Sequence, residues 1–176
     1  MIVSKLKEAL ICLRNLRVTL PYPYEPAPPA EGFRGRIEVD IDKCIGCGAC
    51  ANACPARLIS IIDQDTRRTI EFALGRCTYC ARCAEVCPED AITMTQEFEL
   101  ATDDKNDLFI TVNLNMVKCE RCGKLFATQR MVDKLTEKLP KVIYLEPDDI
   151  RWLKICPDCR KFVEGQRMKD ISSGQS

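Results

Sequence analysis

Twelve of the thirteen cysteines in this chain fall into three ordered sets, and thiolates at such spacings are typical ligands of soft metal centres. The first two sets each read C-x2-C-x2-C-x3-C-P, and they begin 33 residues apart, at positions 44 and 77. The third set consists of two C-x2-C pairs near the C-terminus. The sets are Cys44, Cys47, Cys50 and Cys54; Cys77, Cys80, Cys83 and Cys87; and Cys119, Cys122, Cys156 and Cys159.

The two repeated sets predict two [4Fe–4S] clusters, because such a cube needs one thiolate on each of its four irons. Three cysteines spaced three apart can surround one side of a cube, but the fourth cannot reach the far corner from the same tight loop. In chains that carry this run twice, the fourth cysteine ligates the other cluster. The predicted ligands are therefore crossed: Cys44, Cys47, Cys50 and Cys87 for one cluster, and Cys77, Cys80, Cys83 and Cys54 for the other.

Residues beside the cysteines shape these loops. Pro55 and Pro88 lack an N–H and fix φ, so each turns the chain out of its ligand loop. Gly46 and Gly48 let the backbone of the first loop approach sulfur closely, whereas the second loop has no glycine. Three arginines close to the ligands in sequence either raise the cluster potentials or are ordinary surface charges: Arg57, Arg76 and Arg82.

The third set predicts one tetrahedral metal ion bound by four thiolates, Cys119, Cys122, Cys156 and Cys159. Zinc is the favoured ion; a single iron is the alternative because the same ligands suit it, and a redox dithiol is a third interpretation. Residues 129–139 predict an amphipathic helix that ends at Pro140, and residues 142–145 predict a strand. The metal would then stabilise an insertion with a small core of its own.

Composition excludes several classes of function. The chain has 176 residues, with 26 Lys plus Arg, 26 Asp plus Glu and no histidine. Balanced charge gives no sign of a nucleic-acid partner, and the missing histidine removes the most common general base. No nucleophile–base pair or phosphate-binding glycine loop is evident, so we expect no catalytic residues. A disulfide framework is disfavoured because such frameworks are typical of small secreted domains.

The N-terminus predicts an amphipathic helix. Its apolar residues recur at helical spacing: Val3, Leu6, Leu10, Leu13 and Leu16. The segment is also basic, with Lys5, Lys7, Arg14 and Arg17 against one acid, Glu8. Such a helix can lie in a membrane interface, or its apolar stripe can dock on a partner subunit or on the chain's own core. Cys12 is expected to be a small packed side chain and not a ligand. No stretch is apolar enough to span a bilayer, and charged residues interrupt any secretory signal.

The remaining patterns predict an α+β fold. Residues 36–41, 58–62, 69–72 and 91–94 predict strands, the middle two forming a hairpin, and a short helix should follow each cluster loop, at Ala51 and Ala84. We expect a duplicated bacterial-type two-cluster ferredoxin core flanked by an N-terminal helix and a C-terminal metal-ribbon-like subdomain. The expected segments are 1–17 (anchor or docking helix), 18–35 (proline-rich extended spacer), 36–100 (ferredoxin domain), 101–118 (connector), 119–160 (four-cysteine subdomain) and 161–176 (disordered tail).

Beyond the cysteines, the chain resembles a known family over roughly residues 1–118. The sequences Tyr22-Pro-Tyr-Glu-Pro, Phe33-Arg-Gly-Arg and Gln96-Glu-Phe-Glu-Leu around the two cluster motifs look like the two-cluster ferredoxin-type subunit of respiratory complex I. They look equally like the homologous subunit of membrane-bound [NiFe] hydrogenases and formate hydrogenlyases. The four-cysteine tail is similar to that of the formate hydrogenlyase-type subunit and departs from most complex I versions, which favours the hydrogenase branch.

That resemblance implies an electron-transfer subunit on the cytoplasmic face of the cell membrane, attached through its partners or its N-terminal helix. Its partners would be hydrogenase small and large subunits, membrane-arm subunits and a peripheral electron donor. The alternatives are a complex I-type NADH/quinone oxidoreductase subunit, a freely diffusing ferredoxin, and a structural adaptor whose tail recruits a partner. The N-terminal helix and proline-rich spacer disfavour the free ferredoxin, since a diffusing carrier needs neither.

Overall fold

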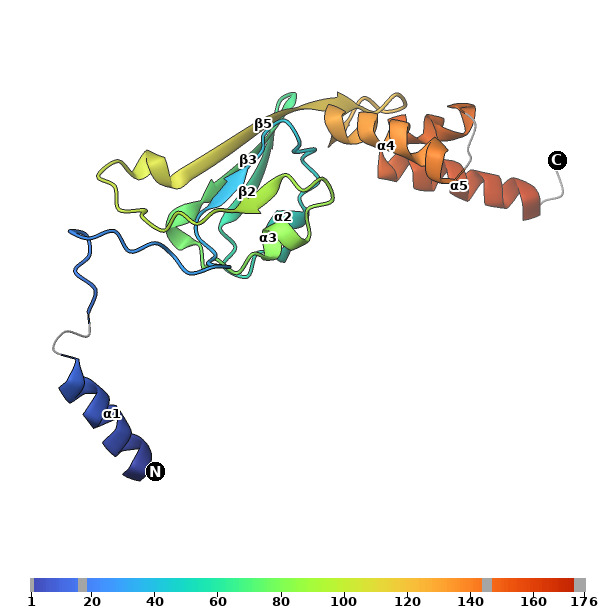
Figure 1. Cartoon of the computed structure of the whole chain (residues 1–176). Coiled ribbons are helices and arrows are strands. Elements are labelled where there is room, and N and C mark those ends of the chain that lie inside the picture. Colours follow the sequence, from blue (N-terminus) through green and yellow to red (C-terminus); the bar gives the residue numbers. More distant parts are fainter. Residues whose placement is uncertain (1, 16–18, 144–146, 173–176) are drawn as a thin grey trace. The chain divides into compact units, whose positions relative to one another are not determined.

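The computed structural model describes residues 2–15, 19–143 and 147–172, and the chain forms two compact units, residues 1–33 and 34–176. The first unit contains helix α1 (Ile2–Arg14), followed by an irregular segment (Figure 1). The side chains of α1 are exposed, and Cys12 is exposed as well, so the prediction that this thiol is packed was wrong. Membrane or partner docking by α1 stays a prediction. Within the described ranges, no helix is both long and apolar enough to cross a membrane.

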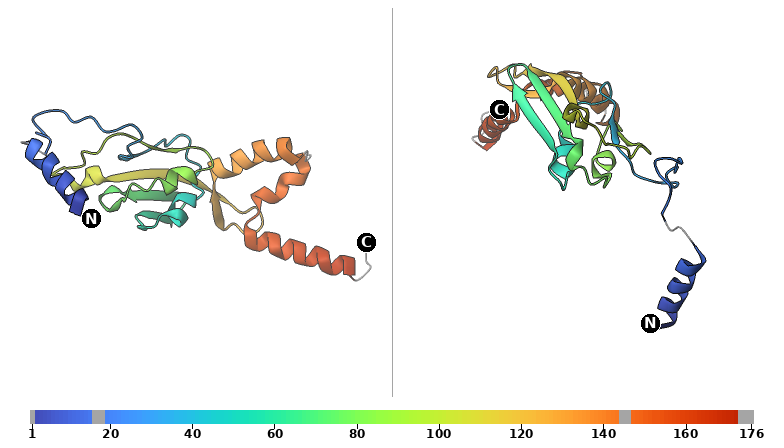
Figure 2. Two further views of the ribbon diagram at one scale, coloured as in Figure 1. Left: turned by 60° about the horizontal axis from the view of Figure 1, so that its bottom comes forward. Right: turned by 90° about the vertical axis from the view of Figure 1, so that its left-hand side faces the viewer.

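The second unit contains two antiparallel sheets (Figures 1 and 2). One is the pair β1 (Ile37–Val39) and β4 (Ile92–Met94). The other has the order β2-β3-β5-β6, with β2 (Ile59–Gln64), β3 (Arg67–Ala73), β5 (Phe109–Lys118) and β6 (Leu125–Thr128). The helices are α2 (Ala49–Ala53), η1 (Leu74–Arg76), α3 (Arg82–Glu85), η2 (Lys105–Leu108), α4 (Gln129–Ile143), η3 (Pro147–Lys154) and α5 (Pro157–Ser172).

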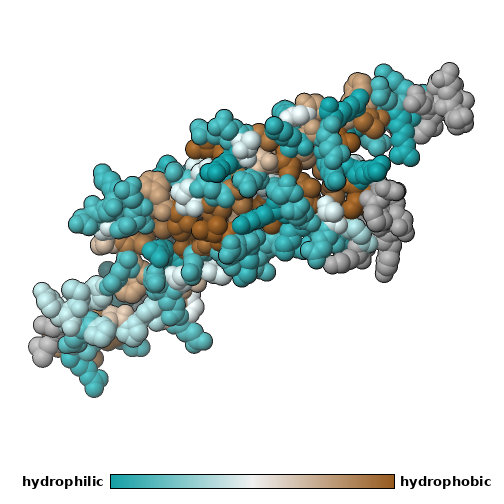
Figure 3. All heavy atoms as spheres, turned by 90° about the horizontal axis from the view of Figure 1, so that it is seen from above, coloured by the Kyte–Doolittle hydropathy of each residue, from teal (hydrophilic) through white to brown (hydrophobic). Residues whose placement is uncertain are grey.

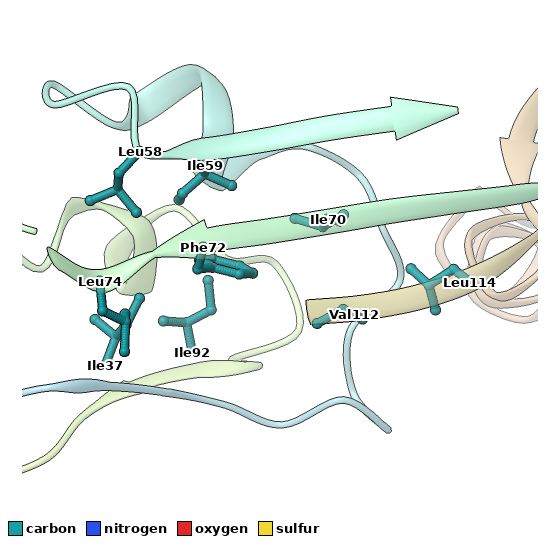
Figure 4. Close-up of a cluster of buried hydrophobic side chains, with 9 residues drawn as sticks. All are labelled: Ile37, Leu58, Ile59, Ile70, Phe72, Leu74, Ile92, Val112 and Leu114. Carbon is teal, nitrogen blue, oxygen red and sulfur yellow. The ribbon is translucent and has the colours of Figure 1, made fainter. Parts of the chain in front are cut away.

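A core of nine apolar side chains lies between the hairpin strands and the β1–β4 pair (Figure 4). These residues are Ile37, Leu58, Ile59, Ile70, Phe72, Leu74, Ile92, Val112 and Leu114. Ile70 and Phe72 share one face of β3, and Val112 and Leu114 one face of β5, because side chains on a strand alternate between its two faces. Cysteines of both cluster loops pack against this core. Hydrophobic residues also reach the surface in the space-filling view, where they form a band bordered by polar residues (Figure 3). The core therefore supports both cluster loops from one side.

The internal repeat is visible in the backbone of the two loops. Residues at equivalent positions of the repeat share a positive φ: Gly46 (72°) with Tyr79 (53°), Gly48 (79°) with Ala81 (65°), and Arg57 (48°) with Asp90 (48°). Each pair is separated by the same 33 positions as Cys44 and Cys77 (for example, 79 minus 46). The second loop thus adopts the left-handed conformation of the first without glycine, which is unusual for L-residues.

Three expectations about the C-terminal part were wrong. The 101–118 connector contains a ten-residue strand, β5, whose alternating Val112 and Leu114 are buried and which pairs with β3. Helix α4 passes through Pro140 to Ile143, so no strand begins at 142, and 144–146 lie outside the described residues. Pro140 lacks an N–H and so cannot donate to the carbonyl of Thr136, which costs the helix one hydrogen bond without ending it there. Residues 161–172 are helical in α5 and not disordered, and 173–176 are not described.

Gly46 is expected to tolerate no larger residue. A Cβ atom there would lie 2.5 Å from Cδ1 of Leu114 and 2.8 Å from Cγ2 of Thr128, at a φ of 72°. Left-handed strain of about 1–2 kcal/mol and overpacking of about 1–3 kcal/mol both apply. Gly46→Ala should therefore lower the free energy of unfolding of the cluster-loaded chain by roughly 2–5 kcal/mol, seen as a lower melting temperature. The control is Ala81→Gly, which relieves left-handed strain and should change stability by less than about 1 kcal/mol. Equal losses in both variants would contradict this assignment.

Candidate metal centres

Two cavities lie beside the core, and each is lined by four cysteines. The first cavity contains Cys44, Cys47, Cys50 and Cys87, together with Ile70, Phe72 and Ile92. The second cavity contains Cys54, Cys77, Cys80 and Cys83, together with Ile37, Leu58 and Ile59. In both, three cysteines come from one repeat and the fourth from the other. The fold thus brings together the crossed sets that the spacing predicts.

The short helices after the loops account for this crossing. Helix α2 begins just after Gly48 and carries the chain away from the first loop, so that Cys54 reaches the second cavity. Helix α3 begins after Ala81 and carries Cys87 to the first cavity in the same way. Strand β1 precedes the first motif and β4 follows the second, and the two strands pair with each other: Ile37 lies opposite Met94 and Val39 opposite Ile92. This pairing holds the two repeats together.

Burial makes these thiols poor acids on their own. Desolvation raises the pKa of Cys50 to about 12 and also raises the pKa values of Cys44 and Cys83. A thiolate in such a site needs a compensating cation, which irons of a cluster would supply. Four sulfur donors per cavity, otherwise apolar walls and this need for positive charge fit a [4Fe–4S] cluster in each cavity.

Backbone N–H groups point at two of the cysteine sulfurs. The N–H of Tyr79 donates to Sγ of Cys77 at 3.4 Å, and the N–H of Ala91 donates to Sγ of Cys87 at 3.2 Å. Hydrogen bonds to ligand sulfur stabilise negative charge and so tune a cluster's reduction potential.

Arg68 is the arginine that contacts the first loop from the hairpin. Its Nη1 donates to the carbonyl oxygen of Gly46 at 2.9 Å, while Nε and Nη2 donate to the two carboxylate oxygens of Asp63 at 2.7 and 2.8 Å. The hydrogen bond from Arg68 lowers the pKa of Asp63, and the hydrogen bond to Asp63 raises that of Arg68. The bidentate pair fixes a guanidinium beside the loop that carries Cys47.

The sequence-predicted arginines lie elsewhere. Arg57 and Arg76 are exposed, and Arg82 is exposed with an ion pair to Oε2 of Glu85 at 3.0 Å. At the second loop, Nη1 of Arg34 donates to the carbonyl oxygen of Cys80 at 3.3 Å. Distance along the sequence could not identify Arg68 or Arg34, because each reaches its loop from another strand or segment.

The four tail cysteines converge on one point. All their Sγ atoms lie within 4.8 Å of one another, and Sγ of Cys122 is 3.7 Å from Sγ of Cys156. In a tetrahedral site with metal–sulfur bonds of about 2.3 Å, the sulfurs lie roughly 3.8 Å apart. The set therefore has the number of donors and the spacing of a closed four-thiolate metal site.

Hydrogen bonds to Cys119 support this site. The backbone N–H groups of Cys156 and Arg121 donate to its Sγ at 3.2 and 3.4 Å. Burial acts to raise the pKa of Cys119, but backbone hydrogen bonds, first that from Cys156, outweigh it and lower the pKa to about 6. Burial and the neighbouring thiols raise the pKa of Cys159 to about 12. A bound cation would stabilise all four sulfurs as thiolates, including that of Cys159, whose pKa is raised without it.

The same subdomain has a small core of its own, whose residues are not part of the nine-residue core. Val132 from α4 and Ile150 and Leu153 from η3 are buried, as are Cys119 and Cys156 themselves. Outside this core, Arg121 lies over the ring of Phe162 and Arg160 over that of Trp152, with guanidinium-to-centroid distances of 4.4 and 4.8 Å. A metal ion here would join the β5–β6 turn, which carries Cys119, to the start of α5.

Comparisons with known proteins found a matching family model and several similar chains. A family model described as "4Fe-4S dicluster domain" matches residues 43–91, which contain all eight cysteines of the two cavities. The NAD(P)H-quinone oxidoreductase subunit I of Rippkaea orientalis is 36% identical over 148 residues, covering 78% of this chain and 74% of that protein. The subunit of the same name from Prochlorococcus marinus subsp. pastoris is 36% identical over 174 residues, covering 92% and 81%. A chain of the membrane-bound sulfane sulfur reductase, described as an archaeal respiratory membrane complex, is 34% identical, with a TM-score of 0.43 and coverage of 57% and 56%.

Proposed function

Because the chain belongs to the family of NAD(P)H-quinone oxidoreductase subunit I, we propose that it is an electron-transfer subunit of a complex I-like membrane complex. The observation that carries this proposal is the pair of four-cysteine cavities on one apolar core. A [4Fe–4S] cluster bound in each cavity would supply one-electron oxidation and reduction. The chain's own contribution is to hold, space and tune the two clusters.

The ligands in this proposal are the crossed sets: Cys44, Cys47, Cys50 and Cys87 for the first cluster and Cys54, Cys77, Cys80 and Cys83 for the second. The names of the relatives favour the complex I-type alternative over the hydrogenase branch that the tail suggested. We place the protein at the cytoplasmic face of the membrane, held there by partner subunits or by α1. Its partners would be neighbouring iron–sulfur and membrane-arm subunits.

Purification of the tagged chain from membranes of its own host, in a mild detergent, tests this proposal. We expect it to co-purify with membrane-arm subunits and a quinone-reactive module, and the complex should transfer electrons to a quinone. Elution of the native protein as a free monomer of the chain's own mass would instead indicate a diffusing ferredoxin and would refute the subunit assignment.

A hydrogenase or formate hydrogenlyase complex is the second candidate, and the tail favours it. The four converging cysteines, Cys119, Cys122, Cys156 and Cys159, form the feature by which this chain resembles the formate hydrogenlyase-type subunit. The same purification separates the two candidates. A co-purifying [NiFe] large subunit, with hydrogen uptake or evolution, would favour the hydrogenase branch over the quinone-reactive one.

For the tail site we propose a structural zinc ion, with a single iron as the alternative because four thiolates suit either metal. The buried position of Cys119 and Cys156 supports a closed structural site. Metal analysis of the purified chain distinguishes the ions. Zinc predicts about one zinc beside the cluster iron, whereas a single iron predicts an additional high-spin ferric EPR signal after oxidation.

A further inference from the structure

We propose that the C-terminal subdomain positions and tunes the first cluster: Arg130 and Thr128 hold the loop that carries Cys44, and the charge of Arg130 raises that cluster's reduction potential. This inference rests on the proposed function, since it requires clusters in both cavities. It assigns a redox role to a segment, β6 and α4, that contains none of the cluster cysteines.

Arg130 caps the carbonyl groups at the entrance to the first loop. Its Nη1 donates to the carbonyl oxygens of Ile41, Asp42 and Cys44, the last two at 3.3 Å. Its Nη2 lies 3.8 Å from Oδ1 of Asp42. One guanidinium therefore binds three carbonyls that precede or include the first predicted ligand, and places a positive charge beside the loop that would hold the first cluster.

Thr128 makes the adjoining contact and is completely buried. Its hydroxyl donates to the carbonyl oxygen of Ile45 and accepts from the N–H of Met131 at 3.3 Å, near the start of α4. The same oxygen thus caps the helix and holds the loop, which uses both its donor and its acceptor capacity. The missing side chain of Gly46 leaves the space that the methyl group of Thr128 approaches.

Helix α4 also contacts the segment that supplies the fourth ligand of the first cavity. Glu89, two residues after Cys87, has a side chain only 12% exposed, and it accepts from Nζ of Lys138 at 2.6 Å and Nζ of Lys134 at 3.2 Å. Both ligand-bearing segments of the first cavity are therefore bound by one helix. The second loop receives a different contact, from Arg34 to the carbonyl oxygen of Cys80.

The expected effect of this asymmetry follows from charge. Reduction adds negative charge to a cluster, and a nearby fixed cation stabilises the reduced form, so it raises the potential. The side chain of Arg130 is 40% exposed, so solvent partly screens its effect. Replacing it with a neutral residue should lower the potential of the first cluster, and Lys, a cation without the guanidinium fork, should restore part of the shift.

The test is an EPR-monitored redox titration of the full-length chain carrying both clusters, in wild type, Arg130→Met and Arg130→Lys. The signals are assigned with Cys47→Ala and Cys80→Ala, which remove a ligand from the first and second cavity respectively. Arg130→Met should lower the first cluster's midpoint potential and change the second's by less, with Arg130→Lys between. The charge control is Lys154→Met, which removes a cation that pairs with Glu120 in the tail and should leave both potentials unchanged.

An unchanged first potential in Arg130→Met, or an equal shift of both, would overturn the inference. If Arg130→Met folds poorly, Thr128→Val is the second variant, because it removes the hydroxyl with little change in volume. It should shift the potential of the first cluster. A shift confined to the second cluster would overturn the inference as well. Failure of the proposed function looks different: the native protein would then elute as a free monomer, while wild type would still show two reducible cluster signals and the Arg130→Met shift could still be measured.

Discussion

Replacing Cys54 with alanine should remove the cluster bound by the second motif, although Cys54 belongs to the first. The reason is that Cys54 lines the second cavity with Cys77, Cys80 and Cys83. Iron in the purified, anaerobically reconstituted chain should fall from about eight to about four atoms, since each cluster holds four irons. The reduced EPR spectrum should then contain the first cluster's signal alone.

Matched variants make this test decisive. Cys54→Ala should resemble Cys80→Ala in its remaining signal, and Cys87→Ala should resemble Cys47→Ala, because each pair shares a cavity. If Cys54→Ala resembled Cys47→Ala instead, each motif would bind its own cluster and the crossed assignment would be wrong. Cys12→Ser, at an exposed thiol of α1, serves as the control that should retain all the iron.

Cys156→Ser should remove the tail metal and unfold the small core of the same subdomain, while both cubane clusters remain assembled. Cys156 is 1% exposed, and Val132, Ile150 and Leu153 of the same subdomain are buried as well, so its loss removes a buried metal ligand from that subdomain. Structural zinc contributes about 10–16 kcal/mol in isolated zinc-finger peptides, far more than so small a core supplies alone. Hydrogen exchange over residues 119–169 should increase strongly, and metal analysis should show the loss of about one ion.

The same variant separates structural from redox roles for the tail ion. Loss of complex assembly with both cluster signals retained would support a structural role. Failure of electron transfer within a fully assembled complex would indicate that the ion is itself redox-active. Because α4 carries Arg130, the first cluster's potential should also fall in Cys156→Ser if the unfolding reaches that helix. Retention of the tail ion in Cys156→Ser would contradict the four-thiolate assignment.

Cysteine spacing predicted which cysteines share a cavity, but it did not predict the side chains that hold the cluster loops. Cysteine spacing is a local property whose consequence, the crossed sets, depends only on the repeat, and the structure brings those residues together. Ile110, Val112 and Leu114 alternate along β5, so the signal for this strand is present in the sequence of the expected connector. Arg68, Arg130 and Thr128 could not be identified, because their partners lie 22, 86 and 83 residues away along the chain.

Local preferences also misjudged two helix ends. Pro140 predicted a stop, yet α4 continues to Ile143. The polar composition after Cys159 predicted disorder, whereas α5 extends to Ser172 and presents Phe162 to the guanidinium of Arg121. The contact between Phe162 and Arg121 joins residues far apart in the sequence, and such contacts are not visible from residue type alone.

The cross-strand pair of Ile59 and Phe72 has a consequence for how electrons are shared. Ile59 lines the second cavity and Phe72 the first, and the two residues lie opposite each other in register. With clusters bound, hydrocarbon and not water would separate two anionic centres, so the electric field of one is weakly screened at the other. An electron on either cluster then disfavours a second electron on its neighbour. Reduction becomes anticooperative, so the midpoint potential measured for each cluster depends on whether the other is already reduced.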